Sequence, residues 1–324
     1  MDIYKELEKK AKKKIRTIIF PESYDERILN AVKTILKKKF ARVVLISRNE
    51  KTGLNIDNDK NLTVIDSEFS AQFLKEYYSV KQKKKPDFSQ RNAEIDIKDP
   101  LIFSLMLLRN NFADGIVAGS VYSTSDVLRN AIPIIGLKGN NKTVSSFFLF
   151  NFPNSGKLNK KVIAFADCGV IPFPDSKQLS DIALQTADNF NKLTGIKPRL
   201  AFLSFSTKGS SKDPSIDKIK EAYKLTKRRK PDLICDAELQ FDAAFVPEVS
   251  LRKNPDGMIK GDANIFIFPD LNSGNIAYKI TERIGGAFAT GPIVQGLARP
   301  VMDLSRGCSS SDIINMTKVI TNLI

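Results

Sequence analysis

Short apolar segments alternate with amphipathic segments along most of this chain. Segments such as 17–20, 41–47 and 114–118 are almost continuously apolar, which is typical of strands covered on both faces. We predict strands at 17–20, 41–47, 62–65, 114–118, 144–150, 161–165, 199–205, 232–236 and 263–268, and helices at 25–38, 70–84, 100–110, 177–193, 213–227 and 273–284. The alternation predicts βαβ units, and therefore an α/β fold with largely parallel sheets. The pattern of 144–150 differs from the others and fits a strand in a mixed sheet.

The polar stretch 139–142 separates two series of these units and predicts a domain boundary. The tail after Pro292 is short and must pack on structure that has already formed, so we expect the chain to return to its first domain. The prediction is two doubly wound domains with mostly parallel sheets, the first made of 1–139 plus 291–324 and the second of 140–290. Ligands of open α/β sheets bind beyond the carboxyl ends of the strands, and pockets favour domain interfaces, so we expect the active site in an interdomain cleft.

Composition restricts where this protein works. No run of 18 or more uncharged apolar residues occurs in the 324-residue sequence, so no membrane span is expected. The segment 1–7 is charged and lacks the apolar region of a secretory signal. The three cysteines, Cys168, Cys235 and Cys308, are far apart and form neither a disulfide framework nor a CxxC metal site. These features predict a cytoplasmic protein without a bound metal.

Charge and the absence of histidine restrict the chemistry. The formal net charge is +15, but the lysines are scattered in short runs rather than gathered in one segment, as a nucleic-acid binder would have them. The positive balance suits an anionic small-molecule substrate. Because the chain has no histidine, Ser-His-Asp and Cys-His mechanisms and His-ligated zinc are excluded. A general base must be Asp, Glu, Lys, Tyr or a thiolate.

The densest group of candidate functional residues lies near the end of the sequence, in the segment 298–312. Ser305, Arg306 and Asp312 stand with several hydroxyls and a glycine just before an apolar-periodic helix at 313–323. A helix N-terminus offers free N–H groups to an anion, and a guanidinium can bind phosphate through two hydrogen bonds. The structural alternative is that Ser309 caps the helix and Asp312 completes a near-capping box. The residues alone leave both readings open.

Several other strand-to-helix turns carry small polar residues. The turn 118–126 is a possible phosphate cradle with Arg129 beside it, or an ordinary N-cap loop; the turn 204–210 contains Ser206 and Thr207, or is simply a solvated βα turn. Three carboxylates in 236–242 fit a hard cation, or else orient nearby Arg and Lys side chains. A fourth turn, 268–275, leads to a helix closed by Arg283, where a cation is favourable by the helix dipole alone. Four such turns together suggest a polyanionic ligand.

Long motifs in this sequence resemble one known family. They are FPESYDERIL from Phe20, ADGIVAGSVYSTSDVLRNA from Ala113, LSFSTKGSSKDP from Leu203, PDLICDAELQFDAAFVPEV from Pro231, ANIFIFPDLNSGNIAYKITERIGG from Ala263 and GPIVQGLARPVMDLSRGCSSSDI from Gly291. Together they cover nearly the whole chain and resemble the phosphate acetyltransferases of the phosphate acetyl/butyryltransferase family.

The resemblance implies the reaction acetyl-CoA + phosphate ⇌ acetyl phosphate + CoA, by direct transfer in a ternary complex. It implies a homodimer of two-domain α/β chains, shaped like the isocitrate and isopropylmalate dehydrogenases, with no cofactor and no metal requirement. Its substrates are CoA, acetyl-CoA, phosphate and acetyl phosphate, and neither nucleic acid nor a membrane is a partner. The family's residues fall here on Asp312 as general base for the CoA thiol, Ser305 at the reacting carbonyl and Arg306 at the phosphate group. Substrate-binding positions implied for CoA or phosphate are Arg129, Arg283, Ser123, Thr124, Ser206, Thr207 and Lys81.

The chain departs from the family pattern at two of these places. Tyr122 begins a segment in which the family usually has His-Thr-Thr-Ala-Asp, and Lys81 stands where the family has an arginine. Lysine keeps the charge but loses the planar fork of arginine, so weaker CoA binding is expected. Alternatives are a phosphate butyryltransferase for longer acyl groups, a decarboxylating dehydrogenase of similar shape, and a basic binding protein without activity.

Overall fold

The chain forms two compact units, and each is described by itself. The computed structural model describes residues 3–47, 59–139, 141–152 and 161–324. The N-terminal unit comprises Tyr4–Gly139 and Leu297–Ile324, and the central unit comprises Asn140–Gly296 with Met1–Ile3. Residues 1–2 and 140, on which the signal and boundary predictions partly rest, lie outside the described residues. The predicted boundary after residue 290 falls within a strand of the central unit, Phe288–Gln295.

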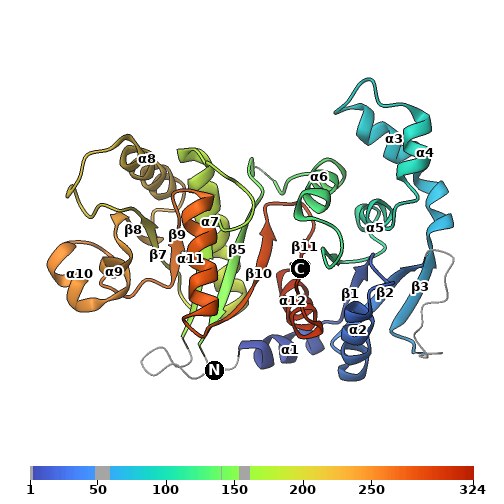
Figure 1. Cartoon of the computed structure of the whole chain (residues 1–324), viewed down its shortest axis with the longest axis horizontal. Coiled ribbons are helices and arrows are strands. Elements are labelled where there is room, and N and C mark those ends of the chain that lie inside the picture. Colours follow the sequence, from blue (N-terminus) through green and yellow to red (C-terminus); the bar gives the residue numbers. More distant parts are fainter. Residues whose placement is uncertain (1–2, 48–58, 140, 153–160) are drawn as a thin grey trace. The chain divides into compact units, whose positions relative to one another are not determined.

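The N-terminal unit is built on a five-stranded sheet in the order β11-β4-β1-β2-β3, in which every pairing is parallel. Helices α2 and α12 lie side by side on one face, and α5 and α6 cover the other (Figure 1). Its elements are α1 Ile3–Lys13, β1 Arg16–Phe20, α2 Glu26–Lys38, β2 Ala41–Ser47, β3 Leu62–Asp66, the 3-10 helix η1 Ser67–Phe73, α3 Leu74–Gln82, α4 Gln90–Asp96, α5 Pro100–Arg109, β4 Gly115–Ala118, α6 Thr124–Ile135, β11 Val301–Asp303 and α12 Ser310–Leu323. The C-terminal segment therefore supplies an edge strand and a covering helix to a sheet begun almost 300 residues earlier.

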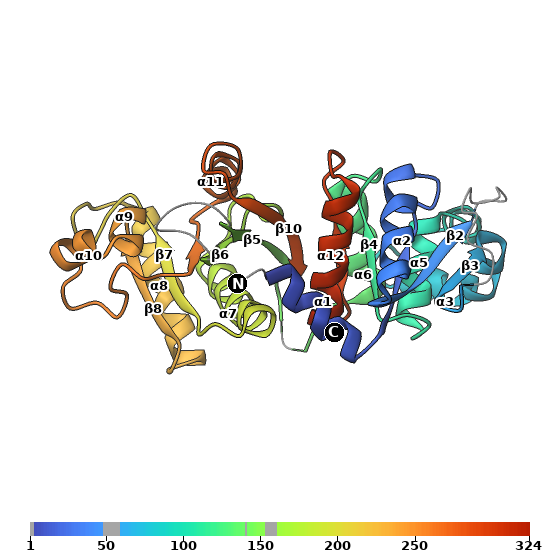
Figure 2. The same ribbon diagram turned by 90° about the horizontal axis from the view of Figure 1, so that it is seen from below.

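The central unit has a six-stranded sheet in the order β10-β5-β6-β9-β7-β8. Strand β5 is antiparallel to both β6 and β10, whereas β6, β9, β7 and β8 run parallel, so the mixed-sheet strand predicted at 144–150 is confirmed. Its elements are β5 Ser145–Asn151, β6 Val162–Ala166, α7 Ser176–Thr194, β7 Arg199–Leu203, α8 Pro214–Arg229, β8 Ile234–Leu239, α9 Phe241–Phe245, α10 Pro247–Lys253, β9 Ile265–Ile267, α11 Leu271–Arg283 and β10 Phe288–Gln295. Figure 2 shows the same ribbon from below.

The predicted α/β class with two mostly parallel sheets is confirmed. Apolar periodicity located the long elements because each buries one face or a whole strand: α2 buries Ile28, Val32 and Ile35, and all of β4 is buried. The pattern missed the helices α1, α4, α9 and α10 and the strands β10 and β11. β11 has three residues and β10 contains a glycine and a proline, so neither gives a strand-like period.

Among the described residues, none of the helices is long and apolar enough to cross a membrane.

Candidate active site

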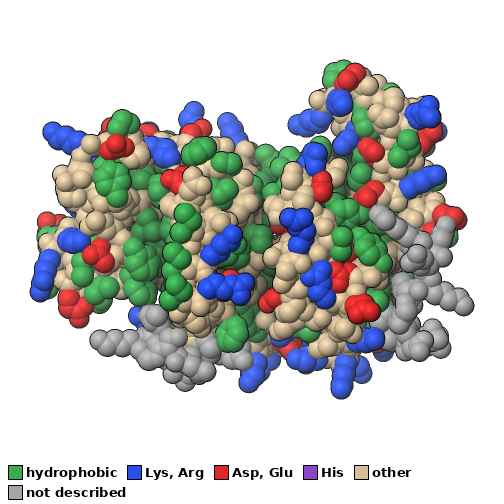
Figure 3. All heavy atoms as spheres, in the orientation of Figure 1, with side chains coloured by type: hydrophobic (Ala, Val, Ile, Leu, Met, Phe, Trp, Pro, Cys, Tyr) green, Lys and Arg blue, Asp and Glu red, His purple; other side chains and the backbone are tan. Residues whose placement is uncertain are grey.

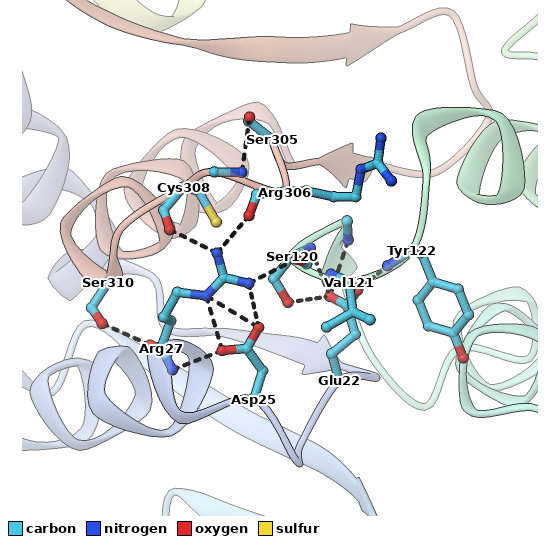
Figure 4. Close-up of polar contacts among 12 residues, drawn as sticks. Glu22, Asp25, Arg27, Ser120, Val121, Tyr122, Ser305, Arg306, Cys308 and Ser310 are labelled. Atoms are coloured by element: carbon cyan, nitrogen blue, oxygen red, sulfur yellow. Dashed lines mark hydrogen bonds and ion pairs between the residues drawn. The ribbon is translucent and has the colours of Figure 1, made fainter.

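Three loops of the N-terminal unit meet at one edge of its sheet. They follow β1, β4 and β11, which are neighbours in the sheet, and the register pairs Ile19 with Ile116 and Asp303 with Ala118. Because these strands are parallel, their carboxyl ends lie at the same end of the sheet. This brings together the three loops, which are residues 21–25, 119–123 and 304–309. Figure 4 shows polar contacts among these loops.

The carboxylate of Glu22 fills the turn after β4. Its Oε2 accepts hydrogen bonds from Gly119 N (3.0 Å), Ser120 N (3.1 Å) and Ser120 Oγ (2.9 Å), and its Oε1 accepts from Val121 N (2.7 Å) and Tyr122 N (2.8 Å). The side chain is fully buried, and successive backbone N–H groups of this kind form an anion-binding nest. The turn 118–126 is a possible phosphate cradle by its sequence. In the structure, the backbone amides of residues 119–122 instead donate to the carboxylate of Glu22 (Figure 4).

Close packing between β4 and β11 requires a glycine at position 119. Gly119 has φ +102°, and a Cβ there would lie 2.4 Å from Asp303 Oδ1 and 2.6 Å from Leu304 N. Asp303 is fully buried, and its Oδ2 accepts a hydrogen bond from Thr124 Oγ1 at 2.5 Å. Its Oδ1 is a buried oxygen with no hydrogen-bond partner among the described residues. Burial, and to a lesser degree the nearby charge of Glu22, raise the pKa of Asp303 to about 7.

Arg27, in the first turn of α2, connects all three loops. Its Nη1 donates to the carbonyl oxygens of Arg306 (2.7 Å) and Cys308 (3.0 Å), and its Nη2 donates to that of Ser120 (2.8 Å). Asp25 accepts from Arg27 Nη2 at 2.6 Å and caps α2 by accepting from Arg27 N. Burial alone would raise the pKa of Asp25, but the hydrogen bonds from Arg27 hold that pKa below its usual value.

The loop after β11 leads directly into α12, where the predicted cap is confirmed. Ser309 Oγ accepts from Asp312 N, while Asp312 Oδ2 accepts from Ser309 N and Ser309 Oγ, both at 2.8 Å. Asp312 Oδ1 accepts no hydrogen bond from the described residues. The side chains of Ser305 and Arg306 are exposed, and the Ser305 hydroxyl accepts from Gly307 N at 3.2 Å. Ser305, Arg306 and Asp312 are thus brought together on one loop-helix junction.

The start of α6 uses most of its polar groups locally. Ser123 caps the helix by accepting from Asp126 N and donates its hydroxyl to Asp126 Oδ2 at 2.6 Å, and Thr124 donates to Asp303. Arg129 pairs with Asp126 at 2.5 Å, and its side chain is 68% exposed. The N-cap reading of this turn is therefore correct in structure, and Arg129 is the group of the turn most available to a ligand.

The two departures from the family pattern have local partners. The Tyr122 hydroxyl donates to Asp99, whose carboxylate caps α5 by accepting from Leu101 N. Lys81, in the last turn of α3, places its ammonium 5.7 Å from the ring centre of Tyr77 and 5.5 Å from that of Phe88. Both distances are within the range of cation–π interactions, so the ammonium of Lys81 interacts with these two rings.

In the central unit, Ser206 and Thr207 stand in the turn after β7 and are tied to β8. Ser206 Oγ donates to Glu238 Oε1 at 2.8 Å, and Thr207 Oγ1 accepts from Gln240 N at 2.9 Å. Glu238 also accepts from Gly209 N at 2.6 Å and pairs with Lys220 at 3.0 Å. Its φ of +54° is in the left-handed region, which is unusual for a glutamate and is held here by these contacts.

The remaining candidates lie elsewhere in the central unit. Arg283 ends α11 with an 81% exposed side chain whose Nε lies 3.7 Å from Glu282. Asp236 pairs with Lys208 and accepts a hydrogen bond from Ile259 N. This carboxylate and that of Glu238 therefore bind lysines and backbone groups, which agrees with the structural alternative to a cation site. Across the residues that the structure describes, no group of three or more Cys, Asp and Glu side chains is placed to hold a metal.

Reasoning from the sequence assigned no role to Glu22, Arg27 or Asp303. The first two lie in the segment FPESYDERIL, and a signal was present: charged residues directly follow an apolar strand, at the end of the sheet where ligands bind. Nothing in the sequence indicated that their partners would be backbone groups almost 100 and 280 residues away.

Comparison with known proteins decides the family. The family model of phosphate acetyl/butaryl transferase matches residues 2–321. A phosphate acetyltransferase of Acetivibrio thermocellus is 42% identical over 323 residues, covering 98% of this chain and 97% of the relative.

This chain belongs to the phosphate acetyl/butaryl transferase family.

Solved structures agree with this family and fold. A phosphotransacetylase from Streptococcus pyogenes matches with a TM-score of 0.91 and 36% identity, covering 99% of this chain and 97% of that one. A putative 4-hydroxythreonine-4-phosphate dehydrogenase from Salmonella typhimurium matches with a TM-score of 0.54 and 10% identity over 96% of this chain and 99% of that one, a likeness of fold alone. The family resemblance drawn from the motifs is thus confirmed, and the chain is a transferase.

Proposed function

We propose that this chain, an enzyme with phosphate acetyltransferase activity by its family, transfers the acetyl group directly between CoA and phosphate, with Asp312 as general base. In the direction of CoA acetylation, Asp312 accepts the proton of the CoA thiol. The sulfur then forms a bond to the acetyl carbon of acetyl phosphate, and the carbon–oxygen bond to phosphate breaks. Phosphate is the leaving group, so no acyl-enzyme is needed.

The observation that carries this proposal is the geometry of the junction between β11 and α12. Asp312 uses Oδ2 for its capping contacts and keeps Oδ1 free of contacts with the described residues, so the cap leaves an oxygen able to take a proton. Arg306 presents an exposed guanidinium suited to phosphate, and Ser305 an exposed hydroxyl for the carbonyl oxygen.

Cys308 is the obvious competitor, because a thiol in this loop could form an acyl-thioester. Its side chain is buried, and burial raises the pKa of the Cys308 thiol to about 11 although Arg27 nearby lowers it. Since the thiolate is the reactive form, little of it exists at neutral pH. This supports transfer without a cysteine intermediate.

Substrate binding is the second part of the proposal. Arg129 and Arg283, whose side chains are largely exposed, would contact CoA or phosphate. We propose five further residues at the same substrates: Ser123, Thr124, Ser206, Thr207 and Lys81. In the structure, the hydroxyl or ammonium group of each already contacts another group of the chain. No metal and no cofactor takes part in the proposed reaction. We place the enzyme in the cytoplasm, where its three free cysteines would stay reduced.

We also propose that the active form is a homodimer. Helix α11 exposes Ile276 (58%) and Ile280 (53%), its C-cap residue Ile284 (82%) continues the same helical spacing, and the exposed Phe288 (63%) follows. Figure 3 shows this apolar column on the surface over α11. An exposed apolar stripe of this kind marks an interaction surface, and a twofold axis would bury it against itself. Ile280→Glu should shift the mass in solution from dimer to monomer, whereas Leu251→Glu, at an exposed site on α10 (73%), should not.

A thiol-release assay with acetyl-CoA and phosphate tests the mechanism. Asp312→Asn should lower kcat by about 10²-fold or more, the usual contribution of a general base, with KM for acetyl-CoA little changed. Arg306→Lys should raise KM for phosphate, because a point charge cannot reproduce the fork. Asp175→Asn, which alters the capping box of α7, controls for the loss of a cap alone and should keep its activity. Normal kcat in folded Asp312→Asn would reduce Asp312 to a capping residue, and butyryl-CoA in place of acetyl-CoA tests the longer acyl group.

A further inference from the structure

Every N–H group of the Arg27 guanidinium donates a hydrogen bond to another group of the chain. An arginine has five N–H groups. Nε donates to Asp25 at 3.1 Å, Nη2 to Asp25 Oδ2 and the Ser120 carbonyl, and Nη1 to the carbonyls of Arg306 and Cys308. No N–H group is left for a substrate, although the side chain is about one-third exposed. Whatever Arg27 does for the reaction, it does through these partners.

These partners are the backbone on either side of the proposed reactive side chains. The two carbonyls on Nη1 belong to Arg306 itself and to Cys308, the residue before the Ser309 cap. On the other side of that cap, Ser310 Oγ donates to the Arg27 carbonyl at 3.0 Å. Arg27 therefore holds the loop immediately before and after Ser309, whose partner is Asp312. Figure 4 shows Arg27 between Arg306, Cys308 and Ser310.

The contact with Ser120 connects this loop to the turn after β4, which Glu22 holds. Ser120 N and Oγ both donate to the buried carboxylate of Glu22, so the carbonyl that Arg27 binds belongs to a turn fixed from its other side. Asp25, the counter-ion, is fixed as well, because it caps α2 with the same oxygen that accepts from Arg27 Nε. The guanidinium of Arg27 therefore fixes the position of the loop after β11 relative to the loops that follow β1 and β4.

We propose that Arg27 is a positioning residue for the transfer reaction: it sets the backbone of Arg306–Ser309, and so places Arg306 on phosphate and Asp312 on the thiol, without touching substrate. This inference rests on the proposed roles of Arg306 and Asp312. A misplacement of about 1 Å at a reacting group can cost about 10²-fold in rate, so a group that fixes a loop in this way matters to kcat.

Arg27→Lys is the variant that tests the positioning role most directly. Lysine keeps the charge beside Asp25 but offers three donors from one atom, which cannot span the Asp25 carboxylate and three separate carbonyls. We expect kcat to fall at least about tenfold. Arg299→Lys is the matched control, because Arg299 also donates to a backbone carbonyl of the same unit, that of Leu108 at 2.6 Å, but does not contact the loop. It should stay within about threefold of the parent, since surface changes away from a site are usually mild.

Hydrogen exchange in the free protein separates positioning from substrate binding. The amides of Gly307 and Cys308 donate to Ser305 and that of Ser309 donates to Asp312, so all three should be protected in the parent. Arg27→Lys should accelerate their exchange without any substrate present, whereas Arg299→Lys should not. This readout does not depend on the chemistry, so it stands even if Asp312→Asn proves active and the proposed mechanism fails.

Two further measurements complete the test. Arg27→Lys and Arg306→Lys combined should lose less than the product of their separate effects, because a loop without Arg306 has less left to position. Millimolar guanidinium should restore part of the activity of Arg27→Ala and should do nothing for Arg299→Ala. Parent-like loop exchange in Arg27→Lys, or fully multiplicative losses with Arg306→Lys, would show that Arg27 does not act through the loop and would overturn the proposal.

Discussion

Both units fix a strand-to-helix turn with a buried carboxylate, and they differ in what the turn leaves available. In the N-terminal unit, Glu22 binds only backbone amides and one hydroxyl, and the reactive candidates Ser305 and Arg306 keep their side chains exposed. In the central unit, Glu238 takes the hydroxyl of Ser206, one of the candidates itself. A turn can therefore carry the right residue types and still consume them internally.

The comparison also shows two ways to neutralise a buried carboxylate. Glu22 accepts from four backbone amides of a nest and from one hydroxyl and receives no ion pair from the described residues, whereas Glu238 pairs with the half-exposed Lys220. A nest is part of the backbone and cannot move away, but a lysine on the surface can be replaced by water. We expect the N-terminal turn to be the more sensitive of the two to a change of charge.

The largest effect should come from Glu22→Gln compared with Glu238→Gln. The glutamine amide would face N–H donors at one oxygen site of Glu22 and lose at least two charge-assisted hydrogen bonds, a cost of about 3 kcal/mol or more. Glu238→Gln can keep its contacts to Ser206 and Gly209 and loses only the lysine pair, about 1 kcal/mol or less.

Urea unfolding and kcat measured on both variants check this expectation. Glu22→Gln should lose both stability and turnover, because the Ser120 carbonyl that Arg27 binds lies in the disturbed turn. Equal losses in the two variants would remove the distinction between the nest and the ion pair.

Asp303 should make stability depend on pH. Its pKa in the folded protein, about 7, is above the ordinary value of 3.8, so its stabilising contribution is complete below about pH 4 and is lost as pH rises through 7. The slope is at most about 1.4 kcal/mol per pH unit in that window. Asp303→Asn cannot ionise and should remove this dependence, gaining stability relative to the parent between pH 5 and pH 7.5 in urea titrations. Parallel pH curves for the two proteins would show that Asp303 does not titrate there.

Ser206→Ala sharpens the comparison from the other side. If the hydroxyl of Ser206 serves mainly Glu238, its loss should cost about 1 kcal/mol of unfolding free energy and change KM for CoA by less than about twofold. Thermal unfolding and KM measured on one preparation decide the matter. A large rise in KM with unchanged stability would instead place Ser206 on the substrate.

Cys308→Ala should have the smallest effect of the set. The thiol is buried with its pKa raised to about 11, and the loop contact to Arg27 uses the Cys308 carbonyl, which alanine retains. We expect kcat to be largely retained. Incubation with labelled acetyl phosphate in the absence of CoA should leave no label on the denatured parent; stoichiometric label on Cys308 would contradict direct transfer.

The sequence alone determined the α/β class, most element positions and the cap at the start of α12, beside the proposed reactive side chains. Burial on both faces of a parallel strand is written locally as an apolar run, and Ser309 and Asp312 carry a capping pattern that spans only four residues. Family motifs added the expected roles of Ser305 and Asp312. All of this information lies within short windows of the chain, which is why it could be predicted.

Only the tertiary structure decided which polar groups meet. Glu22 and the amides of 119–122 are almost 100 residues apart, and Arg27 and the Cys308 carbonyl are 281 residues apart. Backbone donors and acceptors are the same at every position, so no residue pattern marks the ones that a distant carboxylate or guanidinium will bind. Strand order brings them together, because β1 lies beside β4 and β4 beside β11, and that order follows from how the whole sheet packs.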